Sequence, residues 1–153
     1  MTKVELLKDL SKNHLSIQFI SADTYLWSPK ERTVYYQADD PTEVGQWTLL
    51  HETCHGLLNH INYYSDFELV KLEVDAWEKA EELADSLGIK IDQEHIQDCL
   101  DSYRDWQYRR SICPKCELGG VQTDQKTYTC LFCNGTWHVS AARFCRPYRR
   151  RAL

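Results

Sequence analysis

The sequence predicts an α+β protein, with helices packed on a small antiparallel sheet and a small C-terminal domain that contains cysteine pairs. Three observations indicate this fold class. Four segments show helical periodicity with capping residues, two strand candidates lie between the first two helices, and the composition changes near Ser111. Helical periodicity stops there while Cys, Gly and Thr increase, so we expect one domain over residues 1–110 and a second over residues 111–153.

Each expected helix begins at a capping residue. Thr2-Lys-Val-Glu5 fits a capping box, in which the first and fourth side chains bond each other's backbone N–H groups, and it opens a helix to about Asn13. Asp40-Pro-Thr-Glu43 fits a second box, with proline at the favoured first helical position, and opens a helix to about Asn62. The two further helices are expected from Ser65 or Asp66 to the C-terminal cap Gly88, and from Asp92 to about Arg110.

The two strand candidates lie between the first and second helices. One is Ser16–Trp27, either as a single strand or with a break, and the other is Arg32–Gln37, which is rich in the strand-favouring residues Thr, Val and Tyr. The intervening Ser28-Pro-Lys-Glu31 fits a hairpin turn, because proline and polar residues favour turns.

Length and composition exclude several classes of protein. The chain has 153 residues, of which 42% are hydrophobic and 27% charged, and its mean hydropathy is −0.56. No apolar run reaches the roughly 18 residues of a membrane span. The N-terminus lacks the apolar core and cleavage site of a secretory signal. We therefore expect a cytoplasmic protein without a membrane partner.

The charge is distributed unevenly along the chain. Residues 1–110 contain 11 basic and 21 acidic side chains, a net charge of −10, whereas residues 111–153 contain seven basic and two acidic ones, a net charge of +5. Basic charge interleaved with aromatic rings suits contact with phosphates and bases. The aromatic residues of this segment are Tyr128, Phe132, Trp137, Phe144 and Tyr148. Nucleic-acid contact, docking of a basic tail on the acidic body and a tail without a partner all stay open.

The strongest motif is His51-Glu-Thr-Cys-His55, which fits the H-E-x-x-H pattern of zinc peptidases. It lies inside an expected helix, where residues four apart share a face, so both imidazoles can bind one zinc ion. Glu52 can then take a proton from the zinc-bound water. The alternative is a pair of incidental surface histidines. His60 falls nearly opposite both histidines on the helical wheel, so we exclude it as a third ligand.

Glu73 is the expected third zinc ligand. The next helix has an apolar stripe with Glu73 at its centre, where a carboxylate is costly unless it is paired or metal-bound. A buried ion pair with a lysine or arginine is the alternative. Two histidines and a glutamate leave a fourth position for water, whose pKa zinc lowers to about 7. The candidates by residue type for stabilising the oxyanion are Tyr35, Tyr36, Tyr63, Tyr64 and His95.

A second metal site is predicted by Cys113-Pro-Lys-Cys116 and Cys130-Leu-Phe-Cys133, two CxxC pairs with thirteen residues between them. Such pairs bind structural zinc through four thiolates and leave no position open for chemistry. A redox dithiol is the rival interpretation, but the chain lacks the βαβ pattern that accompanies it. We expect a zinc ribbon, and hence two zinc ions per chain. Cys54 and Cys99 are expected in the core, and Cys145 has no assigned role.

The segment Gln46–Leu58 resembles the active-site helix of the ImmA/IrrE family of zinc metallopeptidases, and Glu73–Ala80 resembles the second motif of that family. The resemblance covers about residues 15–90. It implies a zincin-like fold in which the zinc ligands are His51, His55 and Glu73 and the base is Glu52. Substrates in that family are often helix-turn-helix repressors. The C-terminal ribbon departs from the family's usual minimal form.

Together these observations predict a cytoplasmic zinc endopeptidase that cleaves a regulatory protein, such as a repressor. Two alternatives stay open. SprT-like proteases, which act on DNA-bound proteins, also combine H-E-x-x-H with a zinc ribbon, but they use a third histidine that has no well-placed counterpart here. A non-catalytic regulator would hold DNA or protein on its basic ribbon, with the first zinc site serving only structure.

Overall fold

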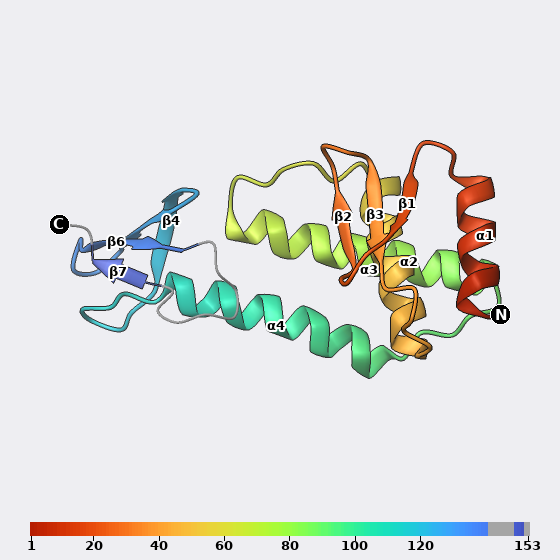
Figure 1. Ribbon diagram of the computed structural model, residues 1–153. Coiled ribbons are helices and arrows are strands. Elements are labelled where there is room, and N and C mark those ends of the chain that lie inside the picture. Colours follow the sequence, from red (N-terminus) through yellow and green to blue (C-terminus); the bar gives the residue numbers. More distant parts are fainter. Residues whose placement is uncertain (141–148, 152–153) are drawn as a thin grey trace. The chain divides into compact units, whose positions relative to one another are not determined.

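The structure is a computed structural model that describes residues 1–140 and the backbone of residues 149–151 (Figure 1). Over these residues it contains four helices and two small sheets, which confirms the expected α+β class. The helices are α1 (Lys3–Asn13), α2 (Glu43–Leu57), α3 (Asp66–Ser86) and α4 (Gln93–Ser111). The strands are β1 (Gln18–Ser21), β2 (Leu26–Ser28), β3 (Thr33–Tyr36), β4 (Gly120–Asp124), β5 (Thr127–Cys130), β6 (Thr136–Val139) and β7 (Arg149–Arg151). Among the described residues, no helix combines the length and apolar composition that crossing a bilayer requires.

The contacts of the chain group it into two compact units. Unit 1 contains Met1–Asn62 and Leu72–Ile96, and unit 2 contains Tyr63–Lys71 and Gln97–Leu153. Both α3 and α4 cross this division, so each of these helices contributes one part to each unit. Composition placed the expected domain boundary at Ser111, whereas the contacts group the second part of α4 with the C-terminal strands.

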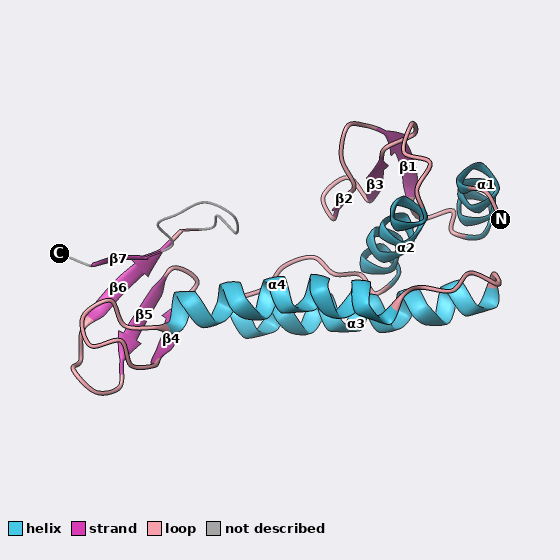
Figure 2. Ribbon diagram, turned by 90° about the horizontal axis from the view of Figure 1, so that it is seen from below, coloured by secondary structure: helices cyan, strands magenta, loops and turns pink. Residues whose placement is uncertain are grey.

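Unit 1 contains a three-stranded sheet in the order β1-β3-β2, and β2 and β3 contact α2 (Figures 1 and 2). Strands β2 and β3 are antiparallel, with Trp27 opposite Val34. Strand β1 is parallel to β3, with Phe19 opposite Val34, so the expectation of an antiparallel sheet is wrong for this pair. The chain reverses direction between β1 and β2 and again between β2 and β3. Strand β3 therefore runs in the direction of β1 and pairs with it.

The expected first helical residue of α2 is Pro41, but the helix begins two residues later, at Glu43. Thr42, not Asp40, is the N-cap, because its Oγ1 accepts a hydrogen bond of 3.0 Å from the N–H of Gly45. Asp40 instead accepts hydrogen bonds from the N–H and hydroxyl of Thr42, and so fixes the turn that leads into the helix. Proline therefore precedes the helix.

The same helix ends at Leu57 rather than near Asn62. Asn59 adopts a left-handed conformation with φ 55°, which an α-helix cannot continue and which Asn tolerates better than most residues. His60 therefore lies outside α2, and the helical wheel that placed it opposite the two histidines does not apply to it.

The core of unit 1 surrounds α2. Leu6 and Leu10 of α1 are fully buried, as are Leu49 and Leu50 of α2. Gly56 allows α2 to approach the sheet closely, because a Cβ at that position would stand 2.7 Å from Ile17 and 3.0 Å from the ring of Trp27. Helix α2 is thus buried along much of its length, including the turns that carry the H-E-x-x-H motif.

The C-terminal strands of unit 2 form an antiparallel sheet in the order β4-β5-β6-β7. Its core contains the fully buried Trp137, which stacks on Tyr128 with ring centroids 5.6 Å apart. Asp66 in α3 and Arg110 in α4 form a buried ion pair of 2.7 Å, and the Tyr128 hydroxyl donates to Asp66 at 2.6 Å. Within this unit, the buried carboxylate therefore ties both helices to the sheet.

Candidate metal sites

Three side chains from α2 and α3 meet inside unit 1. His51 and His55 lie one helical turn apart, with their Nε2 atoms 3.1 Å from each other. The Glu73 carboxylate places Oε2 3.0 Å from the Nε2 of His51 and Oε1 3.4 Å from the Nε2 of His55. The three residues are only 6%, 9% and 5% exposed. We call His51, His55 and Glu73 the His/Glu group.

The distances within the His/Glu group fit a shared metal ion. Zinc bonds of about 2.0–2.1 Å separate neighbouring ligand atoms of a tetrahedron by about 3.3 Å, and the separations here run from 3.0 to 3.4 Å. Burial opposes the ionised form of Glu73, but hydrogen bonds from His51 and His55 outweigh it and lower the pKa of this carboxyl well below its ordinary value. The group therefore favours positive charge and could hold a metal ion. Zinc is compatible with this set of ligand atoms.

Glu52, the expected base, is partly exposed on the same helix. Its Oε2 accepts a hydrogen bond of 2.7 Å from the backbone N–H of Trp27. Trp27 belongs to β2, which forms an edge of the sheet. This bond holds the carboxylate at the sheet edge, next in sequence to His51.

His60 contacts the His/Glu group without belonging to it. Its Nδ1 lies 2.8 Å from the Nδ1 of His55, on the side of that ring away from Nε2. Its carbonyl oxygen accepts a hydrogen bond of 2.9 Å from the indole N–H of Trp27. The helical wheel excludes His60 as a third ligand only if the helix continues to it, and α2 ends at Leu57. Asn59 was the signal in the sequence, since Asn often ends helices in the left-handed conformation.

An indole ring covers His51, the other histidine of the group. Trp77 of α3 stacks on the ring of His51, with centroids 4.2 Å apart and an interplanar angle of 22°. His95 of α4 contacts the same tryptophan edge-on at 5.6 Å. His95, one of the candidates for oxyanion stabilisation, therefore shares Trp77 as a neighbour with His51.

The other candidates for oxyanion stabilisation are four tyrosines in different parts of the chain. The hydroxyl of Tyr35 donates to the carboxylate of Glu31 at 2.5 Å. Tyr36 follows it at the end of β3. Tyr63 and Tyr64 belong to unit 2.

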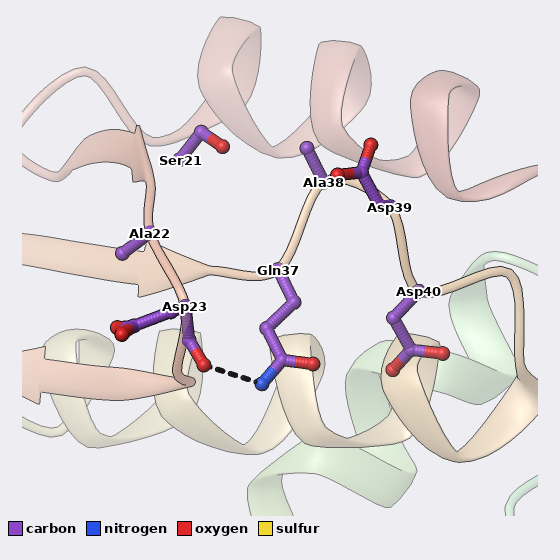
Figure 3. Close-up of a pocket in the computed structure, with 7 residues that line it drawn as sticks. All are labelled: Ser21, Ala22, Asp23, Gln37, Ala38, Asp39 and Asp40. Carbon is purple, nitrogen blue, oxygen red and sulfur yellow. Dashed lines mark hydrogen bonds between the residues drawn. The ribbon is translucent and has the colours of Figure 1, made fainter.

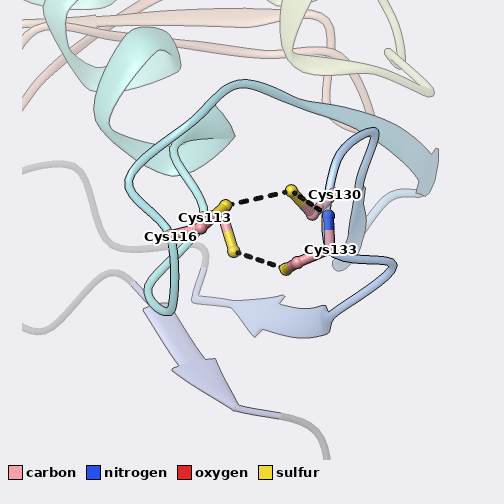
Figure 4. A group of neighbouring side chains, drawn as sticks. All are labelled: Cys113, Cys116, Cys130 and Cys133. Carbon is pink, nitrogen blue, oxygen red and sulfur yellow. Dashed lines mark hydrogen bonds between the residues drawn. The ribbon is translucent and has the colours of Figure 1, made fainter.

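Four cysteines of unit 2 direct their sulfur atoms toward a common centre (Figure 4). The Sγ atoms of Cys113 and Cys133 lie 3.7 Å apart, and those of Cys116 and Cys130 lie 3.4 Å apart. Thiolates bound to zinc at about 2.3 Å in a tetrahedron are about 3.8 Å apart. Backbone N–H groups of Cys133 and Phe132 lower the pKa of Cys130 to about 6, which favours the thiolate. This four-cysteine group could therefore hold a second metal ion.

The remaining cysteines and the aromatic residues near the C-terminus differ in environment. Cys54 is fully buried, and burial raises the pKa of its thiol to about 12, whereas Cys99 is only partly buried. Tyr128 and Trp137 are buried in the core, so their rings cannot stack on bases, whereas Phe132 is 68% exposed. Of the residues expected to contact nucleic acid or left without a role, Phe144, Cys145 and Tyr148 lie outside the described part, and the side chains of Arg149–Arg151 also lie outside it. Nucleic-acid contact through this segment stays a prediction.

A separate hollow lies at the ends of β1 and β3 (Figure 3). Its lining residues are Ser21, Ala22, Asp23, Gln37, Ala38, Asp39 and Asp40. The side-chain amide of Gln37 donates to the carbonyl oxygen of Asp23 at 2.7 Å. None of the residues of the His/Glu group lines this hollow, so it is distinct from the candidate metal site.

Comparisons of the chain with family models, with curated proteins and with solved structures found no match. The basis for a function is therefore the chemistry of the two ligand groups. One has two imidazoles and a carboxylate, and the other has four thiols.

Proposed function

We propose that the protein is a cytoplasmic zinc-dependent endopeptidase. The convergence of His51, His55 and Glu73, with Glu52 next to the first of them, carries this proposal. Catalytic zinc sites use three protein ligands and keep one position open, whereas structural sites use four. Within residues 1–140, the His/Glu group contains three ligand residues and no fourth.

The roles of the side chains follow from their chemistry. A zinc ion at this site would supply a Lewis acid that polarises the peptide carbonyl. His51, His55 and Glu73 would hold the ion, and the carboxylate would offset part of its charge. Glu52 accepts a proton from the attacking water and returns it to the leaving amine. The backbone N–H of Trp27 orients the Glu52 carboxylate for this transfer.

The resemblance of Gln46–Leu58 and Glu73–Ala80 to the ImmA/IrrE family supports this proposal and suggests a helix-turn-helix repressor as the substrate. An activity of the SprT-like class would need a third histidine ligand. His60 is a neighbouring histidine, but it contacts the Nδ1 of His55 rather than the ligand atoms. The glutamate-containing ligand set therefore favours the first family.

We assign the four-cysteine group a structural role, as the zinc site of a zinc ribbon. Four thiolates complete the tetrahedral shell of zinc and leave no position for substrate. The strands around it bury a small core, which contains Tyr128, Trp137 and Val139. A bound metal ion would therefore supply much of the stability of this segment.

Replacing Glu52 by glutamine tests the catalytic proposal. Glu52→Gln keeps the size of the side chain but removes its ability to accept a proton, so hydrolysis should fall by about 10²–10⁴-fold. The zinc content should not change, because Glu52 is not a ligand. The assay incubates the protein with the products of neighbouring genes, including any helix-turn-helix repressor, and identifies fragments by mass spectrometry.

The matched control is Glu78→Gln, which makes the same change at an exposed position of α3. This variant should cleave at the wild-type rate. A Glu52→Gln protein with wild-type activity would refute the assignment of the base. A wild-type protein that holds zinc at the His/Glu group but cleaves none of these proteins would instead favour the non-catalytic regulator.

A further inference from the structure

The end of α2 forms a Schellman motif. The N–H of Asn59 donates to the carbonyl oxygen of Gly56 at 3.1 Å, and the N–H of His60 donates to that of His55 at 2.9 Å. The left-handed conformation of Asn59 reverses the chain between these two bonds. In such motifs the residue after the left-handed one contacts the side chain five positions earlier, usually through apolar groups. Here that contact joins two imidazole rings.

The contact between the two rings defines a proton arrangement. The Nδ1 atoms of His55 and His60 are 2.8 Å apart, so one must carry a proton and the other must accept it. If His60 donated, neutral His55 would carry its own proton on Nε2. That proton would occupy the lone pair that faces His51 and Glu73. Only when His55 donates from Nδ1 does its Nε2 lone pair stay available to a metal ion.

We propose that His60 is a positioning residue for the metal ligand His55. It accepts the Nδ1 proton of His55, fixes that ring in the tautomer that binds metal through Nε2, and sets the orientation of the ring. This inference rests on the proposed zinc site. Partners of this kind on ligand histidines are commonly carboxylates, backbone carbonyls or waters, and here the acceptor is a second imidazole.

The structure holds His60 in place from two directions. The indole N–H of Trp27 donates to its carbonyl oxygen at 2.9 Å. The guanidinium of Arg32 donates to the side chain of the preceding Asn59 at 3.1 Å. Both donors come from the hairpin segment formed by β2, β3 and the turn between them. Both bonds hold the backbone that carries the imidazole of His60.

The two ligand histidines are supported differently. His55 has a hydrogen-bonded partner, whereas the buried Nδ1 of His51 has none within the described part of the chain. The ring of His51 is instead held by stacking on Trp77. Loss of the partner of His55 should therefore affect one ligand and leave the support of the other unchanged.

The test compares His60→Phe with His60→Asn in the full-length protein. Phenylalanine keeps a ring but cannot accept a proton. Asparagine places its amide oxygen at the position of the imidazole Nδ1, two bonds from Cβ, and can accept one. Zinc affinity at each site is measured by competition with a chromophoric chelator, and the four-cysteine group is the internal reference. His14→Phe, at the C-terminal cap of α1, controls for the residue change itself.

His60→Phe should weaken zinc binding at the His/Glu group by about 10–100-fold, and His60→Asn should restore most of it. The visible spectrum of the cobalt-substituted group should change in the same order, while the affinity of the four-cysteine group stays constant. Equal affinity of His60→Phe and wild type would overturn the inference, and so would an asparagine variant as weak as the phenylalanine variant. If the wild-type protein bound zinc at the four-cysteine group alone, the proposed zinc site at the His/Glu group would be wrong, whatever the His60 variants showed.

Discussion

At the scale of single residues, the described part of the chain contains two buried carboxylates with different kinds of partner. Asp66 is 1% exposed and pairs with Arg110, a permanent cation. Glu73 is 5% exposed, and its hydrogen-bond partners are the two imidazoles of the His/Glu group. An ion pair with lysine or arginine was the alternative for Glu73. The structure shows such a pair at Asp66 instead. A carboxylate beside two imidazoles is instead suited to share an added cation.

Asp66→Asn should destabilise unit 2 strongly. Asparagine has nearly the same shape, but it leaves the charge of Arg110 buried without its anion and weakens the hydrogen bond from Tyr128. Loss of one partner of a buried pair costs about 3–5 kcal/mol. Chemical denaturation followed by circular dichroism measures the change in the free energy of unfolding.

The control is Asp101→Asn, which breaks the exposed pair with Arg104. Exposed ion pairs contribute about 0–1 kcal/mol, so this variant should unfold at nearly the wild-type denaturant concentration. Equal effects of the two substitutions would mean that burial does not strengthen the Asp66–Arg110 pair.

At the scale of elements, sequence patterns located the helices but not every boundary or neighbour. The capping box at Thr2 begins α1 as expected, because it depends only on residues a turn apart. The end of α2 depends on one left-handed residue, Asn59, which the apolar periodicity does not reveal. The parallel pairing of β1 with β3 depends on where the hairpin returns in space. The local sequence pattern therefore determines neither the end of α2 nor the strand that pairs with β1.

Gly120→Ala should destabilise the C-terminal strands. A Cβ at this first residue of β4 would collide with the ring of Trp137 and stand 2.8 Å from the carbonyl oxygen of Thr129. The core cannot open there without loss of packing, so we expect a cost of about 1–3 kcal/mol. The measured quantity is the denaturant midpoint of the zinc-loaded protein.

Gly119→Ala is the matched substitution, one residue earlier. A Cβ at Gly119 has no atom within 4 Å, so the change in stability should stay within about 0.5 kcal/mol. If the two alanine variants unfolded alike, close packing of Gly120 against Trp137 would not be the reason for glycine at that position.

At the scale of the whole molecule, the two ligand groups predict two zinc ions per chain. Elemental analysis of the purified protein should find two. Replacing Cys113 and Cys116 by serine should reduce the content to one, and replacing His51 and His55 by alanine should remove the other. A metal content unchanged by the cysteine replacements would contradict the ribbon assignment.

The sequence by itself determined the ligand chemistry of both groups and the positions of the four helices. Ligand spacing along a helix or a CxxC turn is a local property, and the lone carboxylate in an apolar stripe marked Glu73 because burial without a partner is costly. Only the tertiary structure decided which hydrogen-bond partners these residues have. The acceptor for His55, the backbone donor for Glu52 and the parallel neighbour of β1 all depend on chain reversals. Such reversals bring together residues whose spacing in the sequence carries no periodic signal.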